Sequence, residues 1–216
     1  MDIQSYHKLM SEIKALSHDQ NNAVNIIAVS KKQASEKIRI IANEGHKHFG
    51  ENQIQEIEQK WPALKEEFPN IKLHFIGTIQ SRKTERIFEL CDEIHSVDRI
   101  KIVKQIKELE QKFGIVKTYY IQVNTGDELQ KSGVKLNDID DFIRTVRAEY
   151  NFSIDGLMCL PPQNDDPNKH FLSLKSIAES HNIQKLSMGM SADYKEAINC
   201  GSTHLRVGTL IFGKRD

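Results

Sequence analysis

Two lysines follow an apolar run near the start of the chain. Residues 26–31 read IIAVSK, and Lys32 comes next. A buried ammonium group is costly unless it is paired or loses its proton, and a lysine with a lowered pKa attacks carbonyl carbons. The two-residue period of a strand places Lys31 on the face of Ile27 and Val29, so we expect Lys31 to point into a site. The spacing leaves open that both lysines are solvated at a strand end.

The C-terminal segment combines hydroxyl side chains with glycines at two neighbouring strand ends. Ser187 and Ser191 flank Gly189, and Gly208 is followed by Thr209. Glycine lets backbone N–H groups approach an anion closely, and hydroxyls add donors. Ser191 could instead cap a helix, and Gly208 could bend a strand. Together the two loops favour a phosphate site.

Arg206 lies two residues before Gly208 and therefore on the same strand face. A buried guanidinium needs partners, and three are open: a phosphate, a structural carboxylate or a ring nitrogen of a cofactor. A lysine, a phosphate cradle and an arginine together suggest a phosphorylated aldehyde held as an imine. A sugar phosphate bound to Lys31 in the same way is a further hypothesis.

Metal ligands and reactive thiols are not expected. His46 and His48 form an H-x-H pair without a third ligand cluster, which does not make a metal site. His74 and His95 lie in apolar runs and are typical of core histidines held by hydrogen bonds. The cysteines lack a C-x-x-C pattern, so we expect reduced thiols without a chemical role at Cys91, Cys159 and Cys200.

An alternation of strands and helices must position these residues. Apolar residues at steps of three and four predict a helix over 3–16, and further helices are expected at 35–43, between Asp98 and Gly114, from Asp166-Pro167, and at 191–200. Short apolar or β-branched runs, bounded by turn residues, predict the strands. These runs are 26–31, 48–51, 72–77, 93–98, 118–124, 153–160, 185–190 and 204–212.

Eight strands alternating with helices predict an α/β fold on a parallel sheet. An open doubly wound sheet would carry a glycine-rich turn after the first strand, and AVSKKQ has none. We therefore predict one domain over 1–216, a (β/α)8 TIM-type barrel at 24–216 with an extra N-terminal helix at 1–18. In such a barrel the chemistry lies at the carboxyl ends of the strands.

Composition narrows the choice of partners. The 30 basic and 30 acidic residues give a formal net charge of zero, and no long basic run is present, so nucleic acid is not an expected partner. No stretch approaches the ~20 apolar residues of a membrane span, and the first residues do not read as a secretory signal. We expect a cytoplasmic protein without a membrane partner, either a monomer or a weak dimer.

Several segments carry a resemblance to a known family. The sequence resembles the pyridoxal phosphate homeostasis protein family, a single barrel similar to the N-terminal domain of alanine racemase that binds pyridoxal 5′-phosphate (PLP) without established turnover. The match runs in order along nearly the whole chain. It is carried by AVSKKQ (28–33), HFGENQIQE (48–56), HFIGTIQSRK (74–83), IHSVD (94–98), IQVNTGDELQKSGV (121–134), GLMCLPP (156–162) and LSMGMSADYKEAINCGSTHLRVGTLIFGKRD (186–216).

The resemblance implies a set of site residues. It implies that Lys31 forms an imine with PLP, that Asn52 lies near the ring substituents, and that Arg206 faces the pyridine nitrogen. Arg82 stands where the family usually has Asn, whereas the next residue, Lys83, matches. The residues implied for the phosphate are Ser187, Met190, Ser191, Gly208 and Thr209.

A cation at the pyridine nitrogen disfavours protonation of the ring and weakens it as an electron sink. According to the resemblance, racemases of the related barrel have a second, β-rich domain that supplies a catalytic tyrosine. We expect this sequence to have no room for such a domain, because it ends at Asp216. The resemblance thus implies a PLP carrier or reservoir rather than an enzyme, with apo forms of PLP-dependent enzymes as acceptors. The alternative is a racemase that uses Lys31 as its only base.

Overall fold

The computed structural model describes residues 2–19 and 24–213, so the expected domain ends at residue 1 and at 214–216 lie outside the described residues. Strands and helices alternate along this part of the chain. The elements in order are α1 (Ile3–Asp19), β1 (Asn25–Val29), α2 (Ser35–Asn43), β2 (His48–Glu51), α3 (Ile54–Glu67), β3 (Lys72–Phe75), the 3-10 turn η1 (Ser81–Lys83), α4 (Thr84–Leu90), β4 (Glu93–Val97), α5 (Ile100–Phe113), β5 (Thr118–Asn124), β6 (Val134–Lys135), the 3-10 turn η2 (Leu136–Asp138), α6 (Ile139–Tyr150), β7 (Gly156–Cys159), α7 (Pro167–Ser180), β8 (Lys185–Met190), α8 (Tyr194–Asn199), β9 (His204–Val207) and α9 (Thr209–Phe212).

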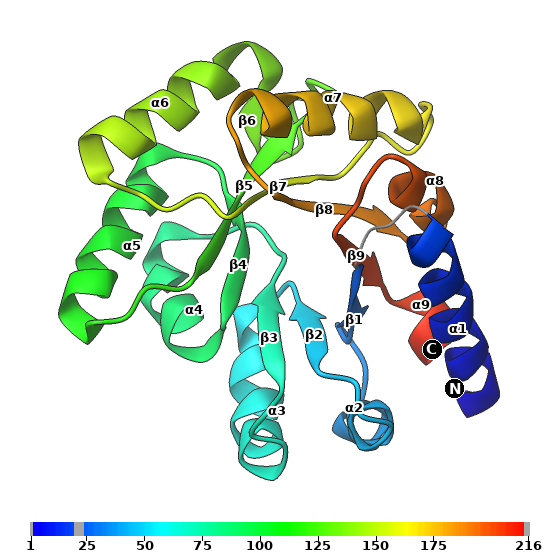
Figure 1. The fold of residues 1–216 in the computed structure, drawn as a ribbon. Coiled ribbons are helices and arrows are strands. Elements are labelled where there is room, and N and C mark those ends of the chain that lie inside the picture. Colours follow the sequence, from blue (N-terminus) through cyan, green and yellow to red (C-terminus); the bar gives the residue numbers. More distant parts are fainter. Residues whose placement is uncertain (1, 20–23, 214–216) are drawn as a thin grey trace.

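The strands close into a parallel barrel. Their order is β4-β3-β2-β1-β9-β8-β7-β5, and β4 also pairs with β5, which closes the ring of eight strands formed by the described residues. The two-residue strand β6 pairs only with β5, at the edge of this ring. Helices surround the strands on the outside (Figure 1). The predicted (β/α)8 TIM barrel is confirmed.

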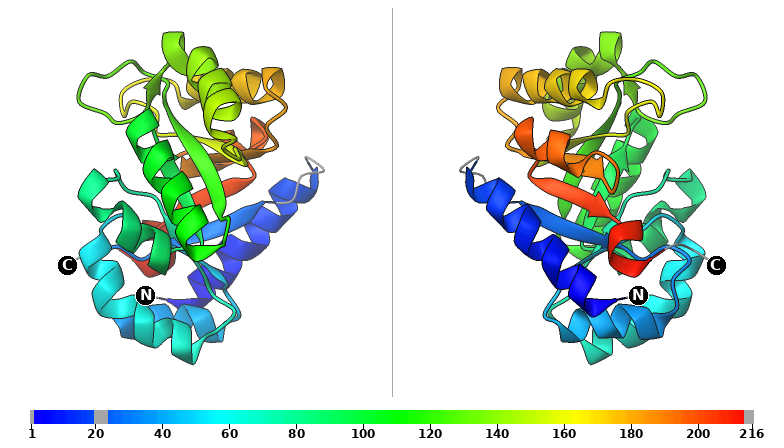
Figure 2. Two further views of the ribbon diagram at one scale, coloured as in Figure 1. Left: turned by 90° about the vertical axis from the view of Figure 1, so that its left-hand side faces the viewer. Right: turned by 90° about the vertical axis from the view of Figure 1, so that its right-hand side faces the viewer.

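The expected extra helix is also present. α1 buries one stripe, formed by Tyr6, Leu9 and Ile13. That stripe faces the barrel, where α1 packs against α8 and α9, and Figure 2 shows it lying along one side of the molecule. The apolar spacing of the first residues thus attaches α1 to the last two helices. No helix in the described ranges is both long and apolar enough to span a bilayer.

Helix ends follow their capping residues in two cases and not in a third. The Asp166 side chain accepts a hydrogen bond from the Asn168 N–H at 3.0 Å, as expected for an N-cap before Pro167. Gly114 ends α5 in the left-handed conformation, with φ of 66°. The expected cap at Asp98 is wrong, because α5 begins one residue later, after the extended Arg99.

The C-terminal elements are shorter than expected. The strand predicted over 204–212 ends at Val207, and the apolar residues after Gly208 form the short helix α9, which buries Ile211 and Phe212 together. Successive buried residues fit a helix face and not the alternation of a strand. The helix predicted from residue 191 begins at Tyr194, because Asp193 Oδ1 first accepts the Met190 N–H at 2.6 Å in a turn.

Candidate functional site

A cavity of about 410 Å³ opens at the carboxyl ends of the barrel strands. This volume lies within the range of small-molecule sites. Two cationic side chains reach it, and the described residues that line it include no Asp or Glu. The cavity therefore favours an anionic ligand. Of the residues expected at the site, those that line it are Lys31, Asn52, Met190, Ser191, Arg206, Gly208 and Thr209.

Lys31 reaches the cavity from a turn. The strand was expected to continue through Lys31, but β1 ends at Val29. Lys32 then adopts a left-handed backbone with φ of 59°, which reverses the chain, and its side chain is exposed. The Lys32 N–H donates to Glu56 Oε2 at 2.6 Å. A turn tied to α3 therefore presents Lys31 to the cavity, whereas Lys32 faces solvent.

A buried ion pair holds this turn from behind. Lys60 Nζ of α3 donates to the carbonyl oxygens of Ser30 and Gln33 at 3.2 and 3.4 Å. The same ammonium contacts Glu51 Oε1 at 2.7 Å, and the Glu51 carboxylate is fully buried. Burial raises the pKa of Glu51, and the neighbouring Lys60 opposes that rise. Lys60 thus connects the turn of Lys31 to the end of β2.

Asn52 supplies an acceptor at the cavity wall. Its Oδ1 atom is buried and has no hydrogen-bond partner among the described residues. Such an atom normally costs free energy, which a bound donor would recover. The Asn52 backbone lies against Gly77, where an added Cβ would be only 2.1 Å from the Asn52 carbonyl oxygen. Glycine at residue 77 therefore allows Asn52 to hold its position.

Arg206 lines the cavity and is only 4% exposed. Its two terminal nitrogens donate to Ser187 Oγ and to the Cys159 carbonyl oxygen, both at 2.7 Å. Burial lowers the pKa of the guanidinium. In the described part of the chain no carboxylate forms an ion pair or hydrogen bond with Arg206, so the structural carboxylate that the sequence left open is not its partner.

Ser187 does not line the cavity. It is fully buried one layer below, between Arg206 and His95, whose Nδ1 lies 2.9 Å from Ser187 Oγ. Ser187 Oγ therefore contacts the arginine directly, and its expected role at a phosphate stays a prediction. Gly208 lines the cavity, and an added Cβ there would lie 3.3 Å from the Val29 carbonyl oxygen; its role at a phosphate stays a prediction.

Other cavity residues were not singled out from the sequence. Gln122 lines the cavity from β5, and its Nε2 donates to the Ser132 carbonyl oxygen at 2.9 Å. A glutamine inside the apolar run TYYIQVN was the available signal. Thr78 adds a hydroxyl after β3. Arg82 and Lys83 lie in η1 and do not line the cavity.

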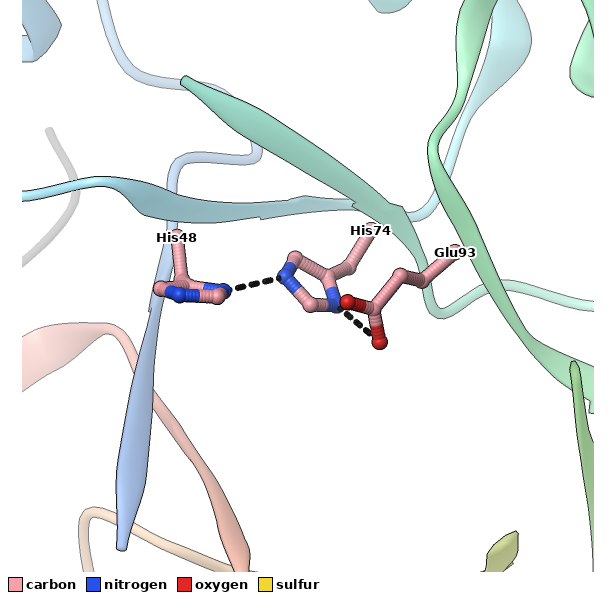
Figure 3. Close-up of side chains that lie close together, drawn as sticks. All are labelled: His48, His74 and Glu93. Carbon is pink, nitrogen blue, oxygen red and sulfur yellow. Dashed lines mark hydrogen bonds and ion pairs between the residues drawn. The ribbon is translucent and has the colours of Figure 1, made fainter. Parts of the chain in front are cut away.

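The barrel interior holds a separate group of buried polar residues (Figure 3). His48 Nδ1 lies 2.9 Å from His74 Nε2, and Glu93 Oε2 lies 3.5 Å from His74 Nδ1. His48 and Glu93 thus face opposite nitrogens of the His74 ring, and one ligand atom from each of these three residues lies within 4.8 Å of the other two. The buried His74 and His95 were expected to be held by hydrogen bonds, and this is confirmed.

The comparisons with known proteins point to one family. Residues 4–216 match the family model described as alanine racemase, N-terminal domain. The pyridoxal phosphate homeostasis protein of Pasteurella multocida is 35% identical over 205 residues, which cover 90% of this chain and 88% of that protein. The protein of the same name from Escherichia coli is 32% identical over 202 residues, covering 89% and 86%.

Solved structures agree with the sequence relatives. PipY of Synechococcus elongatus with PLP bound is 30% identical, with a TM-score of 0.80 over 88% of this chain and 92% of that one. Alanine racemase of Acinetobacter baumannii shares the fold at 18% identity, with a TM-score of 0.72, over 99% of this chain and 62% of the racemase. The chain belongs to the pyridoxal phosphate homeostasis protein family.

Proposed function

We propose that this protein binds PLP in the cavity at the carboxyl ends of the barrel strands, attached covalently to Lys31, and serves as a carrier or reservoir in PLP homeostasis. One observation carries the proposal. The cavity brings Lys31 and Arg206 together with the unpartnered Asn52 Oδ1, and no carboxylate of the described residues lines it. A ligand with a phosphate, a ring nitrogen and an aldehyde suits this set of groups.

Each side chain has a defined part in holding the ligand. PLP supplies an aldehyde whose oxygen leaves as water when a lysine amine bonds to the carbon, so hydrolysis returns the aldehyde unchanged. Lys31 is the amine that lines the cavity. The hydroxyls of Ser191 and Thr209 would donate to the phosphate, near Met190 and Gly208. Asn52 would accept from a ring substituent.

Arg206 favours retention over turnover. A guanidinium has donors and no acceptor, so a ring nitrogen that faces it must be unprotonated. An unprotonated pyridine is a poor electron sink, which slows the loss of an α-proton from an amino acid. We therefore propose binding and release in place of catalysis, with apo forms of PLP-dependent enzymes as acceptors, in the cytoplasm.

The relatives support this reading. The curated relatives are named for PLP homeostasis, and the PipY structure contains PLP. The racemases match at under 20% identity and support the fold alone.

Titrating the protein with PLP and recording the absorbance tests the proposal. PLP should saturate the protein with an absorbance change, and pyridoxal, which lacks the phosphate, should bind at least about tenfold more weakly because charge-assisted hydrogen bonds are lost. Loaded protein should activate an added apo PLP-dependent enzyme. Amino acids in D₂O should keep their α-protons. Sustained α-proton exchange, abolished by Lys31→Ala, would make the protein a racemase-type enzyme and contradict the proposal.

A further inference from the structure

A continuous line of hydrogen bonds runs through the barrel, from the cavity to the amino ends of the strands. Arg206 donates to Ser187 Oγ, and His95 Nδ1 lies 2.9 Å from the same oxygen. His95 Nε2 lies 3.0 Å from His74 Nδ1, and His74 Nε2 lies 2.9 Å from His48 Nδ1. We call these five residues the interior chain.

The guanidinium gives the interior chain one direction. Ser187 Oγ accepts from Arg206, and the structure shows one further partner for it in the described residues, His95 Nδ1. The buried hydroxyl hydrogen is satisfied only if it is donated to His95. His95 must then carry its proton on Nε2 and donate it to His74. His74 in turn must donate from Nε2 to His48.

The opposite direction leaves a group unsatisfied. If His95 carried its proton on Nδ1, Ser187 would receive two donors, and its own hydrogen would have no acceptor at a fully buried position. An unmade buried hydrogen bond is costly. Protonation of both His95 nitrogens meets the same obstacle and adds a buried charge near Arg206. Burial and the neighbouring charged groups in fact hold the pKa of His95 well below its ordinary value.

The other polar groups around the interior chain do not offer the histidines closer hydrogen-bond partners. Glu93 Oε2 lies 3.5 Å from His74 and 3.8 Å from His95, farther than the histidine contacts. Burial raises the pKa of Glu93, and the Tyr120 hydroxyl donates to Glu93 at 3.3 Å. The Tyr120 ring stacks on His95 at 3.8 Å between centroids, which holds the imidazole plane.

We infer that Ser187 and His95 are positioning residues for Arg206, and that the one-way interior chain keeps the Ser187 oxygen available to the guanidinium. The support is uncharged. A carboxylate in place of Ser187 would neutralise Arg206, whereas a neutral hydroxyl leaves its positive charge for the ligand. The inference rests on the proposed function only for its effect on PLP, because the direction of the chain is a property of the unliganded protein.

Nitrogen-15 NMR of the histidine rings tests the direction without PLP. The ¹⁵N shifts and long-range couplings distinguish the tautomers, which coordinates do not show. Both His95 and His74 should carry the proton on Nε2. In Ser187→Ala, His95 should lose this preference and become a mixture of tautomers. A proton on His95 Nδ1 in the unsubstituted protein, or a charged His95 ring, would overturn the inference.

Substitutions then test the link to PLP. Ser187→Ala and His95→Leu should each weaken PLP binding about tenfold, the factor for one lost charge-assisted hydrogen bond. His95→Asn should stay within about threefold of the unsubstituted protein, since an amide oxygen can accept in place of Nδ1. His181→Leu, on the outside of the barrel, is the control. Binding by His95→Leu as tight as that of the control would overturn the inference. Failure of the unsubstituted protein to attach PLP would instead contradict the proposed function and leave the NMR result standing.

Discussion

Replacing Lys60 by methionine should destabilise the protein far more than replacing a neighbouring lysine on the same helix. The Lys60 side chain is 12% exposed and pairs with Glu51, which is 0% exposed. Among the described residues, the Glu51 carboxylate in Lys60→Met keeps only neutral donors, Ser30 Oγ at 2.8 Å and Trp61 Nε1 at 3.2 Å. Its second oxygen already lacks a partner within the described chain.

The expected cost follows from the unpaired charge. Removing one partner of a buried ion pair costs about 3–5 kcal/mol, and the two remaining donors place Lys60→Met near 3 kcal/mol at pH 8. Loss of the ammonium raises the pKa of Glu51 further, so folded Glu51 takes up a proton at a higher pH than the unfolded chain does. The cost should therefore shrink as the pH falls through the Glu51 pKa. Adding Glu51→Gln should recover most of the loss at pH 8.

Urea unfolding at pH 8 and pH 5.5 measures these free energies. Lys65→Met is the matched control, because Lys65 and its partner Asp92 are 30% and 39% exposed, and such a pair contributes at most about 1 kcal/mol. Lys60→Met should also weaken PLP attachment at Lys31, since the turn loses its support. A cost below about 1 kcal/mol at pH 8, unchanged at pH 5.5, would refute the reasoning.

Other substitutions and conditions give independent checks. Gly77→Ala should reduce PLP loading several-fold, because the added Cβ would displace the Asn52 backbone, and an absorbance titration equal to that of the unsubstituted protein would show that Asn52 is not needed. Burial lowers the pKa of His46 to about 4, so as the pH falls the unfolded chain takes up a proton at His46 before the folded protein does. Between pH 7 and pH 5 this difference should lower the free energy of unfolding, measured with urea, by about 2 kcal/mol. The loss should be missing in His46→Gln. Burial raises the pKa of Cys91 and Cys159 to about 12, so at pH 8 neither should react with a thiol reagent before unfolding, and rapid labelling of either would contradict their burial.

Much of the fold could be predicted because the local patterns agree with the tertiary structure. The runs at 48–51, 118–124 and 185–190 form strands with the expected bounds. The signal is plainest at 118–124, which is rich in β-branched and aromatic residues and is followed by a turn. The strand predicted over 204–212 was too long, because its periodicity did not show the change at Gly208 from an extended backbone to a helix. A short apolar run fits either structure.

Site residues could be predicted where the sequence pattern of a single strand end indicates which side chain faces the site. Lys31 could be chosen over Lys32 from alternation alone, although a left-handed turn at Lys32, and not a continued strand, separates them. The position of Ser187 could not be predicted. It depends on how β8 sets its side chain between Arg206 and His95, which come from β9 and β4, and no spacing along the sequence records that contact.

The covalent attachment of PLP to Lys31 is the central claim, and borohydride reduction with peptide mass mapping tests it most directly. The protein is incubated with PLP, reduced and digested, and the phosphopyridoxyl group is located. Lys31 should carry the group in the unsubstituted protein and in Lys32→Ala, and Lys31→Ala should lose it. An adduct on Lys32, or unchanged labelling of Lys31→Ala, would contradict the account.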